Sequence, residues 1–175
     1  GLSVAWVDRG PLGGTCANVG CIPSKMIIAS ADRIVEIQEA DKLGVTAQVL
    51  ETDFQAIMRR MRQLRAKDQE EMRQNIAGTE GLDFYEMEGH FVDAHVLQVG
   101  QDRIHGEKIY IVAGARPLVP PIEGLDGMPY LDNETALELD ERPDSLVIIG
   151  GGYIACEFAH FFAAMGTEVT IVQRN

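Results

Sequence analysis

Hydrophobic and polar positions change their spacing several times along the chain, and each change marks the boundary of a predicted element. Apolar residues from Met26 to Ile37 and from Phe54 to Met72 recur at the three- and four-residue spacing of amphipathic helices. Short apolar or alternating runs indicate strands, and clusters of glycine and proline indicate loops. The predicted order is a strand at 2–8, a loop at 10–14, helices at 23–44 and 53–76, strands near 83–88, 96–99 and 108–112, a strand at 145–150, a helix at 153–165 and a strand at 168–173.

This order predicts an α/β fold with doubly wound, Rossmann-like nucleotide-binding domains. The strand, helix and strand at 145–173 begin a parallel sheet without completing it, and the first strand lacks an earlier strand and helix. We therefore expect an internal fragment of a larger protein. Glycines and prolines at 121–143 predict a connection between a first domain, residues 1–120, and the start of a second, residues 144–175.

Composition and charge narrow the class of protein. Hydrophobic residues make up 46% of the 175 residues, which argues against intrinsic disorder. Fifteen Lys and Arg against 27 Asp and Glu give a net charge of −12, which disfavours nucleic acid and anionic membranes as partners. The arginines of the 53–76 helix are accordingly expected to form a solvated face. No secretory signal or apolar run of roughly 18 residues is present, so a cytoplasmic location is expected.

A glycine-rich turn joins the strand at 145–150 to the following helix. Residues Gly150, Gly152 and Ala155 fit the pattern G-x-G-x-x-A, in which the glycines allow a tight turn and a close approach to a pyrophosphate. The helix start supplies partial positive charge to the phosphates. The next strand ends in Gln173 and Arg174 rather than in the acid that binds a ribose 2′-hydroxyl. An arginine suits a 2′-phosphate, so NADP is favoured over NAD, with NAD left open.

Two cysteines carry the most specific chemical signal. Cys16 and Cys21 can close a disulfide if the turn between them brings their Cα atoms within about 7 Å. A helix start favours the thiolate needed for exchange, and Lys25 adds positive charge one turn later. Zinc would need four ligands, yet only Cys156 and four scattered histidines remain, so no metal site is predicted. Cys156 is expected to pack as a small helix residue, and a purely structural role for the pair stays open.

The segment Gly13–Lys25, G-G-T-C-A-N-V-G-C-I-P-S-K, resembles the redox-active segment of the FAD-dependent pyridine nucleotide–disulfide oxidoreductases. The resemblance extends to the acid-ended first strand, to I-V-A-G-A-R-P at 111–117 and to the glycine-rich turn. Within the family it is greatest to dihydrolipoamide dehydrogenase, with mercuric and mycothione reductases as relatives. It implies that 1–120 is a partial FAD-binding domain without its first βα unit and that 144–175 begins an NAD(P)-binding domain.

The resemblance also implies individual roles. Cys16 is the expected interchange thiol and Cys21 the thiol that contacts the flavin, while Lys25 is expected near the flavin and paired with Glu157. The other expected cofactor-binding residues are Asp8, Gly13, Gly14, Thr15, Gly89, Ala113 and Gly114 for FAD, and Gly150, Gly152, Tyr153, Ile154, Ala155, Gln173 and Arg174 for the nicotinamide dinucleotide, with Tyr153 shielding the flavin. None of the histidines, His90, His95, His105 and His160, matches a motif for a catalytic base.

The implied activity is transfer of two electrons between NAD(P)H, FAD, the cysteine pair and a small disulfide or dithiol such as lipoamide, by a homodimer. Three departures from the family pattern stand out: Ala17 replaces a larger residue, no threonine separates Ala113 from Gly114, and Gln173 replaces an acid. The alternatives are an NADPH-dependent mercuric or low-molecular-weight disulfide reductase, an inactive fragment, and a nucleotide-binding module with structural cysteines.

Overall fold

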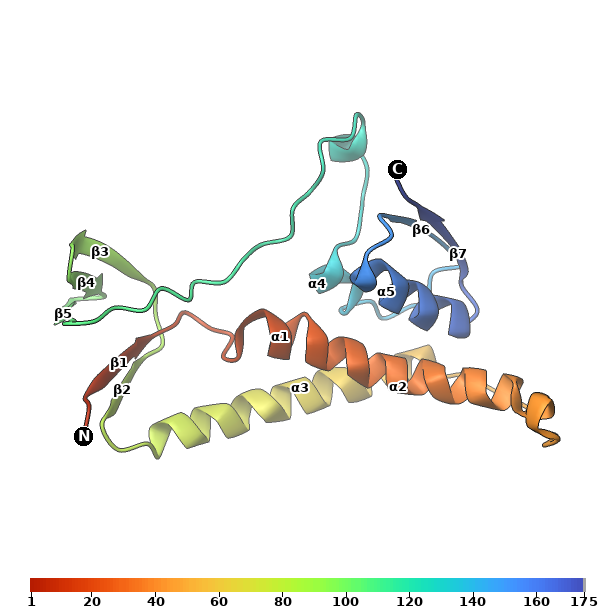
Figure 1. The fold of residues 1–175 in the computed structure, drawn as a ribbon, viewed down its shortest axis with the longest axis horizontal. Coiled ribbons are helices and arrows are strands. Elements are labelled where there is room, and N and C mark those ends of the chain that lie inside the picture. Colours follow the sequence, from red (N-terminus) through yellow and green to blue (C-terminus); the bar gives the residue numbers. More distant parts are fainter. Residues whose placement is uncertain (175) are drawn as a thin grey trace. The chain divides into compact units, whose positions relative to one another are not determined.

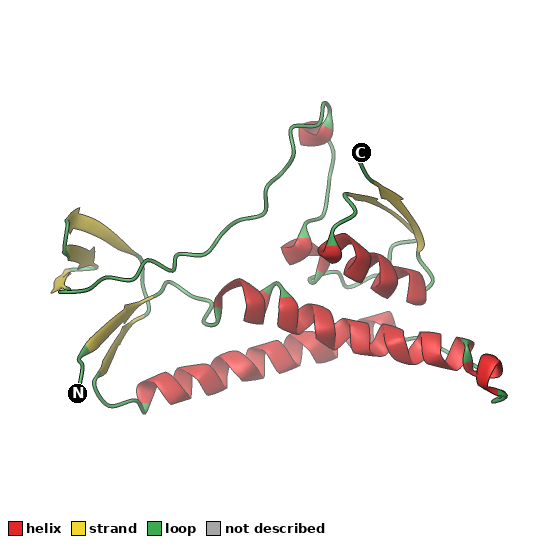
Figure 2. Ribbon diagram, viewed as in Figure 1, coloured by secondary structure: helices red, strands yellow, loops and turns green. Residues whose placement is uncertain are grey.

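The computed structural model describes residues 1–174 and has a mixed α/β fold (Figures 1 and 2). The chain forms two compact units. The first comprises Gly1–Asn18 and Arg65–Arg116, and the second comprises Val19–Leu64 and the chain from Pro117 onward. None of the helices formed by residues 1–174 combines the length and the apolar character required to cross a bilayer.

The first unit contains two small sheets. Strand β1 (Val4–Val7) pairs in parallel with β2 (Leu82–Tyr85), and the rings of Trp6 and Phe84 meet edge to face with centroids 5.8 Å apart. Strands β3 (Gly89–Asp93), β4 (Val96–Val99) and β5 (Asp102–His105) form an antiparallel meander, seen in green in Figure 1. The short helix α1 (Gly14–Asn18) follows the loop after β1.

The second unit is built around α2 (Cys21–Gln38) and α5 (Tyr153–Ala164), which pack against each other. Helix α5 joins β6 (Ser145–Ile149) to β7 (Glu168–Val172), and these strands pair in parallel, as expected of a βαβ unit. The core of this unit is apolar and contains Ile27, Ala31, Ile34, Phe54, Met58, Met61, Leu137, Phe161, Phe162 and Met165. Burial of these side chains fixes α2 and the first turns of α3 (Phe54–Ala77) against the β6–α5–β7 unit.

Helix α3 (Phe54–Ala77) begins in the second unit and ends in the first. The Asp53 carboxylate accepts a hydrogen bond of 2.8 Å from the Ala56 N–H, as expected of an N-cap. The arginines of α3 were expected to form a solvated face, and this expectation is only partly correct. Arg60 donates to the Met26 carbonyl at 2.7 Å, and Arg62 is paired with Asp140 at 2.7 Å. These side chains therefore connect α3 to other segments.

The remaining connections are short helical turns. The 3₁₀ helix η1 (Ala40–Leu43) follows α2, η2 (Leu125–Gly127) lies in the predicted 121–143 connection, and α4 (Asn133–Ala136) follows it. Asp132 caps α4 by accepting from the N–H of Thr135 at 2.8 Å, while the Thr135 hydroxyl contacts the Asp132 backbone N–H. The domain boundaries at 120 and 144 stay a prediction.

Several local predictions are wrong. Residues 108–112 were expected to form a strand, but they belong to a long loop after β5, green in Figure 2. Strands β3 and β5 and helix α1 were not predicted, and α2 begins at Cys21, two residues before Pro23. Pro23 fits within the first turn because the N–H groups there have no partner inside the helix.

Candidate functional site

Cys16 lies in the middle of α1, exposed to solvent, directly after a tightly turned loop. Asp8 at the end of β1 starts this loop, and its carboxylate accepts a hydrogen bond of 2.8 Å from the Gly10 N–H. Thr15 belongs to α1 and is exposed, as are Gly13 and Gly14. The end of the loop and the start of α1 therefore present three of the predicted flavin-contacting residues and the predicted interchange cysteine on one short, solvent-accessible segment.

Gly13 is sterically required in this loop. Its φ is +93°, and a Cβ built there would lie 2.6 Å from the Ala17 Cβ and 2.9 Å from the Met72 Cε. Both distances are shorter than van der Waals contact, and the left-handed backbone adds strain for any other residue. A larger residue at position 17, as is usual in the family, would need still more space beside Gly13.

We expect Gly13→Ala to lower the free energy of unfolding by about 2–4 kcal/mol, the sum of a left-handed backbone and overpacking. Gly14→Ala is the matched control because Gly14 also has a positive φ, +58°, but has nothing within 4 Å of its Cβ position. Its cost should be only about 1–2 kcal/mol. Urea unfolding of both variants measures the difference, and equal losses would contradict the steric argument.

Cys21 is the first residue of α2 and is exposed. One turn later, the buried Ser24 contacts the Cys21 carbonyl at 3.2 Å and the Glu157 carboxylate at 3.0 Å through its hydroxyl. Lys25 forms an ion pair with the same carboxylate from the next position. The start of α2 therefore places Cys21, Ser24 and Lys25 together with Glu157 of α5. The ion pair between Lys25 and Glu157 is present in the structure, whereas the roles of both residues toward a flavin remain predictions.

Lys25 lowers the pKa of Glu157, mainly through the hydrogen bond that its ammonium donates. The Ser24 hydroxyl acts in the same direction, and partial burial opposes both. The Glu157 side chain is 29% exposed and the Lys25 side chain 60%. Solvent therefore screens the pair, and it serves to hold two charges in place more than to stabilise the fold.

Glu157→Gln should reduce the free energy of unfolding at pH 7 by less than about 1 kcal/mol. Because the folded-state pKa is lowered, this contribution is fully present above the unfolded value of about 4.3 and disappears as pH falls through the folded value. Urea unfolding at pH 7 and pH 3 should show the difference from the unmodified protein shrinking in acid. The exposed Glu141→Gln is the control, and a difference that persists at pH 3 would contradict the assignment.

The glycine-rich turn between β6 and α5 has the form that a dinucleotide phosphate needs. Gly150 adopts φ +112° and donates its N–H to the Val172 carbonyl at 2.8 Å, which ties the turn to β7. Gly152 is the N-cap of α5, and no side chain of the described residues caps this helix. A Cβ at Gly150 or Gly152 would meet nothing within 4 Å, so the backbone here is open to a ligand.

Gln173, at the end of β7, lies beside this turn. Its Oε1 is 2.9 Å from the position that a Gly151 Cβ would occupy, so the Gln173 side chain lies directly over the backbone of the turn. The Gln173 amide also donates to the Arg174 carbonyl at 2.9 Å. Arg174 is exposed. The structure therefore brings the predicted selectivity residue Gln173 to the predicted phosphate-binding turn, as the ends of parallel strands require.

The other predicted residues are more scattered. Gly89 begins β3, where a Cβ would lie 3.0 Å from Val7, so this glycine has a packing reason of its own. Ala113 and Gly114 lie exposed in the long loop after β5. Tyr153 and Ile154, in the first turn of α5, are exposed, and Ala155 is half-buried. Their contacts with cofactors remain predictions.

One expectation about the third cysteine is wrong. Cys156 was expected to pack against the sheet, but it is exposed on the first turn of α5, with its Sγ 4.0 Å from the Gly151 carbonyl oxygen. Helical spacing alone did not reveal this, because Glu157 and Phe158 instead turn toward α2 and the core. Of the histidines, His160 contacts Asp32 at 2.7 Å and His95 contacts the Gly106 carbonyl at 3.0 Å.

These residues fit the cofactors that the sequence implies. Gly14 has open space at its Cβ position, and the Asp8 carboxylate keeps one oxygen without a partner among residues 1–174, which suits a ribose hydroxyl. The open turn and uncapped start of α5 suit a pyrophosphate. Bound FAD would supply two-electron chemistry, and a bound nicotinamide would supply hydride.

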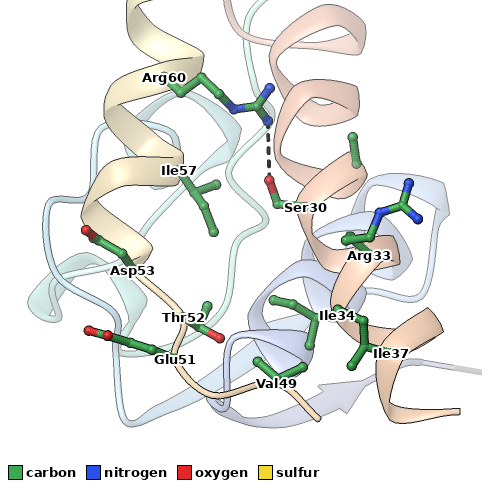
Figure 3. Close-up of a pocket in the computed structure, with 11 residues that line it drawn as sticks. Ser30, Arg33, Ile34, Ile37, Val49, Glu51, Thr52, Asp53, Ile57 and Arg60 are labelled. Atoms are coloured by element: carbon green, nitrogen blue, oxygen red, sulfur yellow. Dashed lines mark hydrogen bonds between the residues drawn. The ribbon is translucent and has the colours of Figure 1, made fainter. Parts of the chain in front are cut away.

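The structure also contains a pocket away from these residues (Figure 3). It has a volume of about 470 Å³ and lies between α2 and the start of α3. Its apolar wall includes Ile34, Ile37 and Ile57, and the hydrogen bond between Arg60 and Ser30 crosses it at 3.3 Å. None of the predicted site residues lines this pocket, so it is not part of the candidate site.

Comparison with known proteins decides the family. The family model for pyridine nucleotide-disulphide oxidoreductases matches residues 1–175, the whole chain. The chain belongs to this family. Its members depend on FAD and a pyridine nucleotide, so the flavoprotein resemblance inferred from the cysteine segment is confirmed. The Rossmann-like fold class is confirmed as well.

Mercuric reductases and dihydrolipoyl dehydrogenases match this chain at similar levels of sequence identity. The chain is 35% identical to a mercuric reductase of Staphylococcus aureus over 175 residues, which is all of this chain and 32% of the relative. It is 33% identical to a dihydrolipoyl dehydrogenase of Bacillus subtilis, with 99% of this chain and 39% of the relative covered. The two sequence identities are nearly equal, so they do not show which of the two kinds of enzyme this chain resembles more.

Solved structures agree on the fold. A copper(II) complex of the HOCl-induced flavoprotein disulfide reductase RclA from Escherichia coli superposes with a TM-score of 0.82 at 35% identity. That match covers 98% of this chain and 36% of RclA. The chain spans about a third of the length of the relatives it matches, so the activity of the whole protein is a matter for proposal.

Proposed function

We propose that this chain is part of a flavin-dependent disulfide oxidoreductase that exchanges two electrons between NAD(P)H, FAD and the Cys16–Cys21 pair. The observation that carries the proposal is the grouping of Cys21, Ser24, Lys25 and Glu157 at the start of α2, in a chain of this family. A structural cysteine pair has no need of a fixed lysine–glutamate pair one turn away. Dihydrolipoamide-like dithiols are the preferred substrate class, and a homodimer is the preferred assembly.

The chemistry assigns distinct tasks to the two thiols. In the reducing direction, the Cys16 thiolate attacks a substrate disulfide, forms a mixed disulfide and releases the first substrate thiolate. The Cys21 thiolate then attacks the Cys16 sulfur, releases the second substrate thiol and leaves a Cys16–Cys21 disulfide. The substrate has gained two electrons and two protons. A bound FAD would supply the two electrons that restore the dithiol, and oxidation of a dithiol substrate follows the thiol-exchange steps in reverse.

The remaining groups prepare these thiols for exchange. Cys21 is the first residue of α2, and Lys25 lies one turn later on the same helix. Glu157 in turn fixes the position of the lysine, and Ser24 fixes Glu157 from the other side. Glu157 belongs to α5, which follows the glycine-rich turn. Its ion pair with Lys25 therefore links α2, which begins with Cys21, to the predicted nicotinamide-binding helix α5.

A mercuric or low-molecular-weight disulfide reductase is the second candidate. The observation in its favour is the group of mercuric reductases that match over 98–100% of this chain at 31–35% identity. Arg174 also favours NADPH, the donor that a reductase would use. Both candidates share the same cysteine chemistry and differ in the substrate that meets Cys16.

An anaerobic visible titration of the flavin-loaded protein with NADPH and then NADH tests the proposal. A long-wavelength charge-transfer band that appears on reduction would support a Cys21 thiolate beside the flavin. Flavin bleaching without this band would overturn the coupling between cysteines and flavin. Turnover with lipoamide, oxidised glutathione and Hg²⁺ then distinguishes the two candidates, because each predicts a different preferred substrate.

A further inference from the structure

The side chain of Asn18, the last residue of α1, has one of the most restricted environments in the first unit. It is only 3% exposed, yet its polar atoms are fully used. The Nδ2 amide donates to the Leu12 carbonyl at 2.7 Å and the Gly14 carbonyl at 2.9 Å, and lies 3.4 Å from the Pro11 carbonyl. Three carbonyl oxygens on one side admit only a donor, so the orientation of the amide is fixed.

Helix α3 completes this network from the other side. Gln69 donates its Nε2–H to the Asn18 Oδ1, and Arg65, one turn earlier, donates to the Asn18 backbone carbonyl at 3.2 Å. The two residues are four positions apart and so share one face of α3. The loop before α1 and the end of α1 are thereby attached to the same helix. Cys16 lies between these two attachment points.

We propose that Asn18 and Gln69 form a positioning pair that holds α1, and with it Cys16, in the arrangement required for thiol–disulfide exchange. The hydrogen bonds of Asn18 reach backbone carbonyls of α1 and of the loop before it, so the pair acts through the backbone around Cys16. The proposal rests on the proposed function, because it assigns these residues a role in the redox equilibrium of Cys16 and Cys21. Nothing in the sequence pattern marks Gln69, which lies 51 positions from its partner.

The polarity of the hydrogen bonds makes the proposal testable with a nearly isosteric change. In Gln69→Glu, the ionised carboxylate accepts hydrogen bonds and cannot donate to the Asn18 Oδ1. The Asn18 Oδ1 then either faces a negative oxygen of the carboxylate that Gln69→Glu introduces, or the Asn18 amide rotates so that its Nδ2 faces that carboxylate. The second choice points Oδ1 at the Leu12 and Gly14 carbonyls. Either arrangement leaves buried acceptors facing each other and loosens α1.

A loosened α1 should weaken the disulfide relative to the dithiol. A disulfide tolerates only a narrow range of Cα separations and torsions, so it gains most from a cysteine that is already held in place. In a dithiothreitol redox buffer, the two protein thiols are oxidised to one disulfide while oxidised dithiothreitol takes up the two electrons and two protons. A general loss of fold stability affects both redox forms of the protein and leaves this equilibrium unchanged.

The experiment measures that equilibrium in the flavin-loaded protein by acid quenching, alkylation and mass spectrometry of the peptide that contains Cys16 and Cys21. For Gln69→Glu we expect the disulfide to be about tenfold less stable, which corresponds to about 30 mV for a two-electron couple. Gln69→Leu, which removes the donor but adds no charge, should have a smaller effect of about threefold. Gln63→Glu is the matched control, since Gln63 is an exposed residue of the same helix.

The outcomes separate the two proposals. The positioning pair is supported if the disulfide is weakened most by Gln69→Glu, less by Gln69→Leu and least by Gln63→Glu. If both Gln69 variants match Gln63→Glu while the unmodified protein forms the disulfide, the positioning pair is overturned and the proposed function stands. If the unmodified protein forms no Cys16–Cys21 disulfide in any buffer, both are overturned. Should Gln69→Glu fail to fold, Gln69→Leu carries the comparison alone.

Discussion

Replacing Cys16 by serine is expected to reduce turnover of a disulfide substrate by at least about 10³-fold, because a hydroxyl cannot replace a thiolate in exchange. Cys16 is exposed on α1 in the part of the chain that the structure describes. The measurement is steady-state reduction of a small disulfide by the flavin-loaded protein with NADPH. Flavin reduction by the nucleotide should continue in the variant, since that half-reaction does not involve Cys16.

Cys21→Ser should fail in a different way. Cys16 can still attack the substrate, but no second thiol resolves the mixed disulfide. The variant should therefore accumulate one covalent substrate adduct on Cys16, detectable as a mass increase, and stop. This adduct separates the roles of the two cysteines, whereas loss of a merely structural disulfide would affect both variants equally.

Cys156→Ser is the control for both substitutions. Its thiol is also exposed, but it lies on α5, with its Sγ 4.0 Å from the Gly151 carbonyl oxygen. Its activity should stay within about twofold of the unmodified protein, as for most surface substitutions. A Cys16→Ser protein that retains a tenth or more of the activity would contradict the proposed function.

Local sequence patterns predicted the elements that bury one apolar face. The spacing of Phe54, Met58 and Met61 identified α3, and all three side chains are buried in the core. The β6–α5–β7 unit was predicted nearly to the residue, because a buried strand, a glycine turn and an apolar helix each leave a strong signal. The family was identified from the segment around the two cysteines, and the comparisons confirm it.

The errors arise where tertiary contacts decide the local structure. Residues 108–112 have the β-branched and aromatic composition of a strand, but no partner strand among residues 1–174 pairs with them. Helix α1 is only five residues long and starts with glycine, so propensity does not predict it. It depends on Asn18, whose partners Arg65 and Gln69 are more than 45 positions away. Such long-range hydrogen bonds leave no periodic pattern in the sequence.

The candidate site likewise combines features that the sequence predicted with contacts that only the structure shows. Lys25 and Glu157 are 132 positions apart, and only the family resemblance, not a local pattern, paired them. Ser24 appeared in the recognised segment without a role, yet its buried hydroxyl joins the Cys21 carbonyl to Glu157. Recognition of the segment therefore supplied the residues, and the structure supplied the contacts that connect them.

Arg174→Ala should reduce kcat/KM for NADPH by about 10- to 100-fold, the loss expected for a charge-assisted contact to a phosphate. The value for NADH should change by less than about threefold, because NADH has no 2′-phosphate for the arginine to bind. The preference for NADPH should also decline with added salt in the unmodified protein more than in the variant, since salt screens the exposed guanidinium. Steady-state kinetics with both nucleotides at two ionic strengths measures these effects.

Adding Gln173→Glu to Arg174→Ala should shift the nucleotide preference still further from NADPH toward NADH. The carboxylate accepts hydrogen bonds from a ribose 2′-hydroxyl and repels a 2′-phosphate, so the combined preference should shift toward NADH by roughly 10²- to 10³-fold. Glutamate is nearly isosteric with glutamine, so it fits the same place above Gly151, where the Gln173 Oε1 lies 2.9 Å from a hypothetical Cβ. The backbone of the phosphate-binding turn should therefore keep its position.

Arg59→Ala removes one exposed arginine from α3 and controls for the change in net charge. If it alters NADPH use as much as Arg174→Ala does, the effect is a long-range field and not recognition of the phosphate. If Arg174→Ala lowers kcat/KM for NADH and NADPH equally, the arginine holds the end of β7 in place and does not contact the 2′-phosphate. In that case Gln173 alone, at the edge of the glycine turn, determines selectivity, and the expectation of NADPH loses its main support.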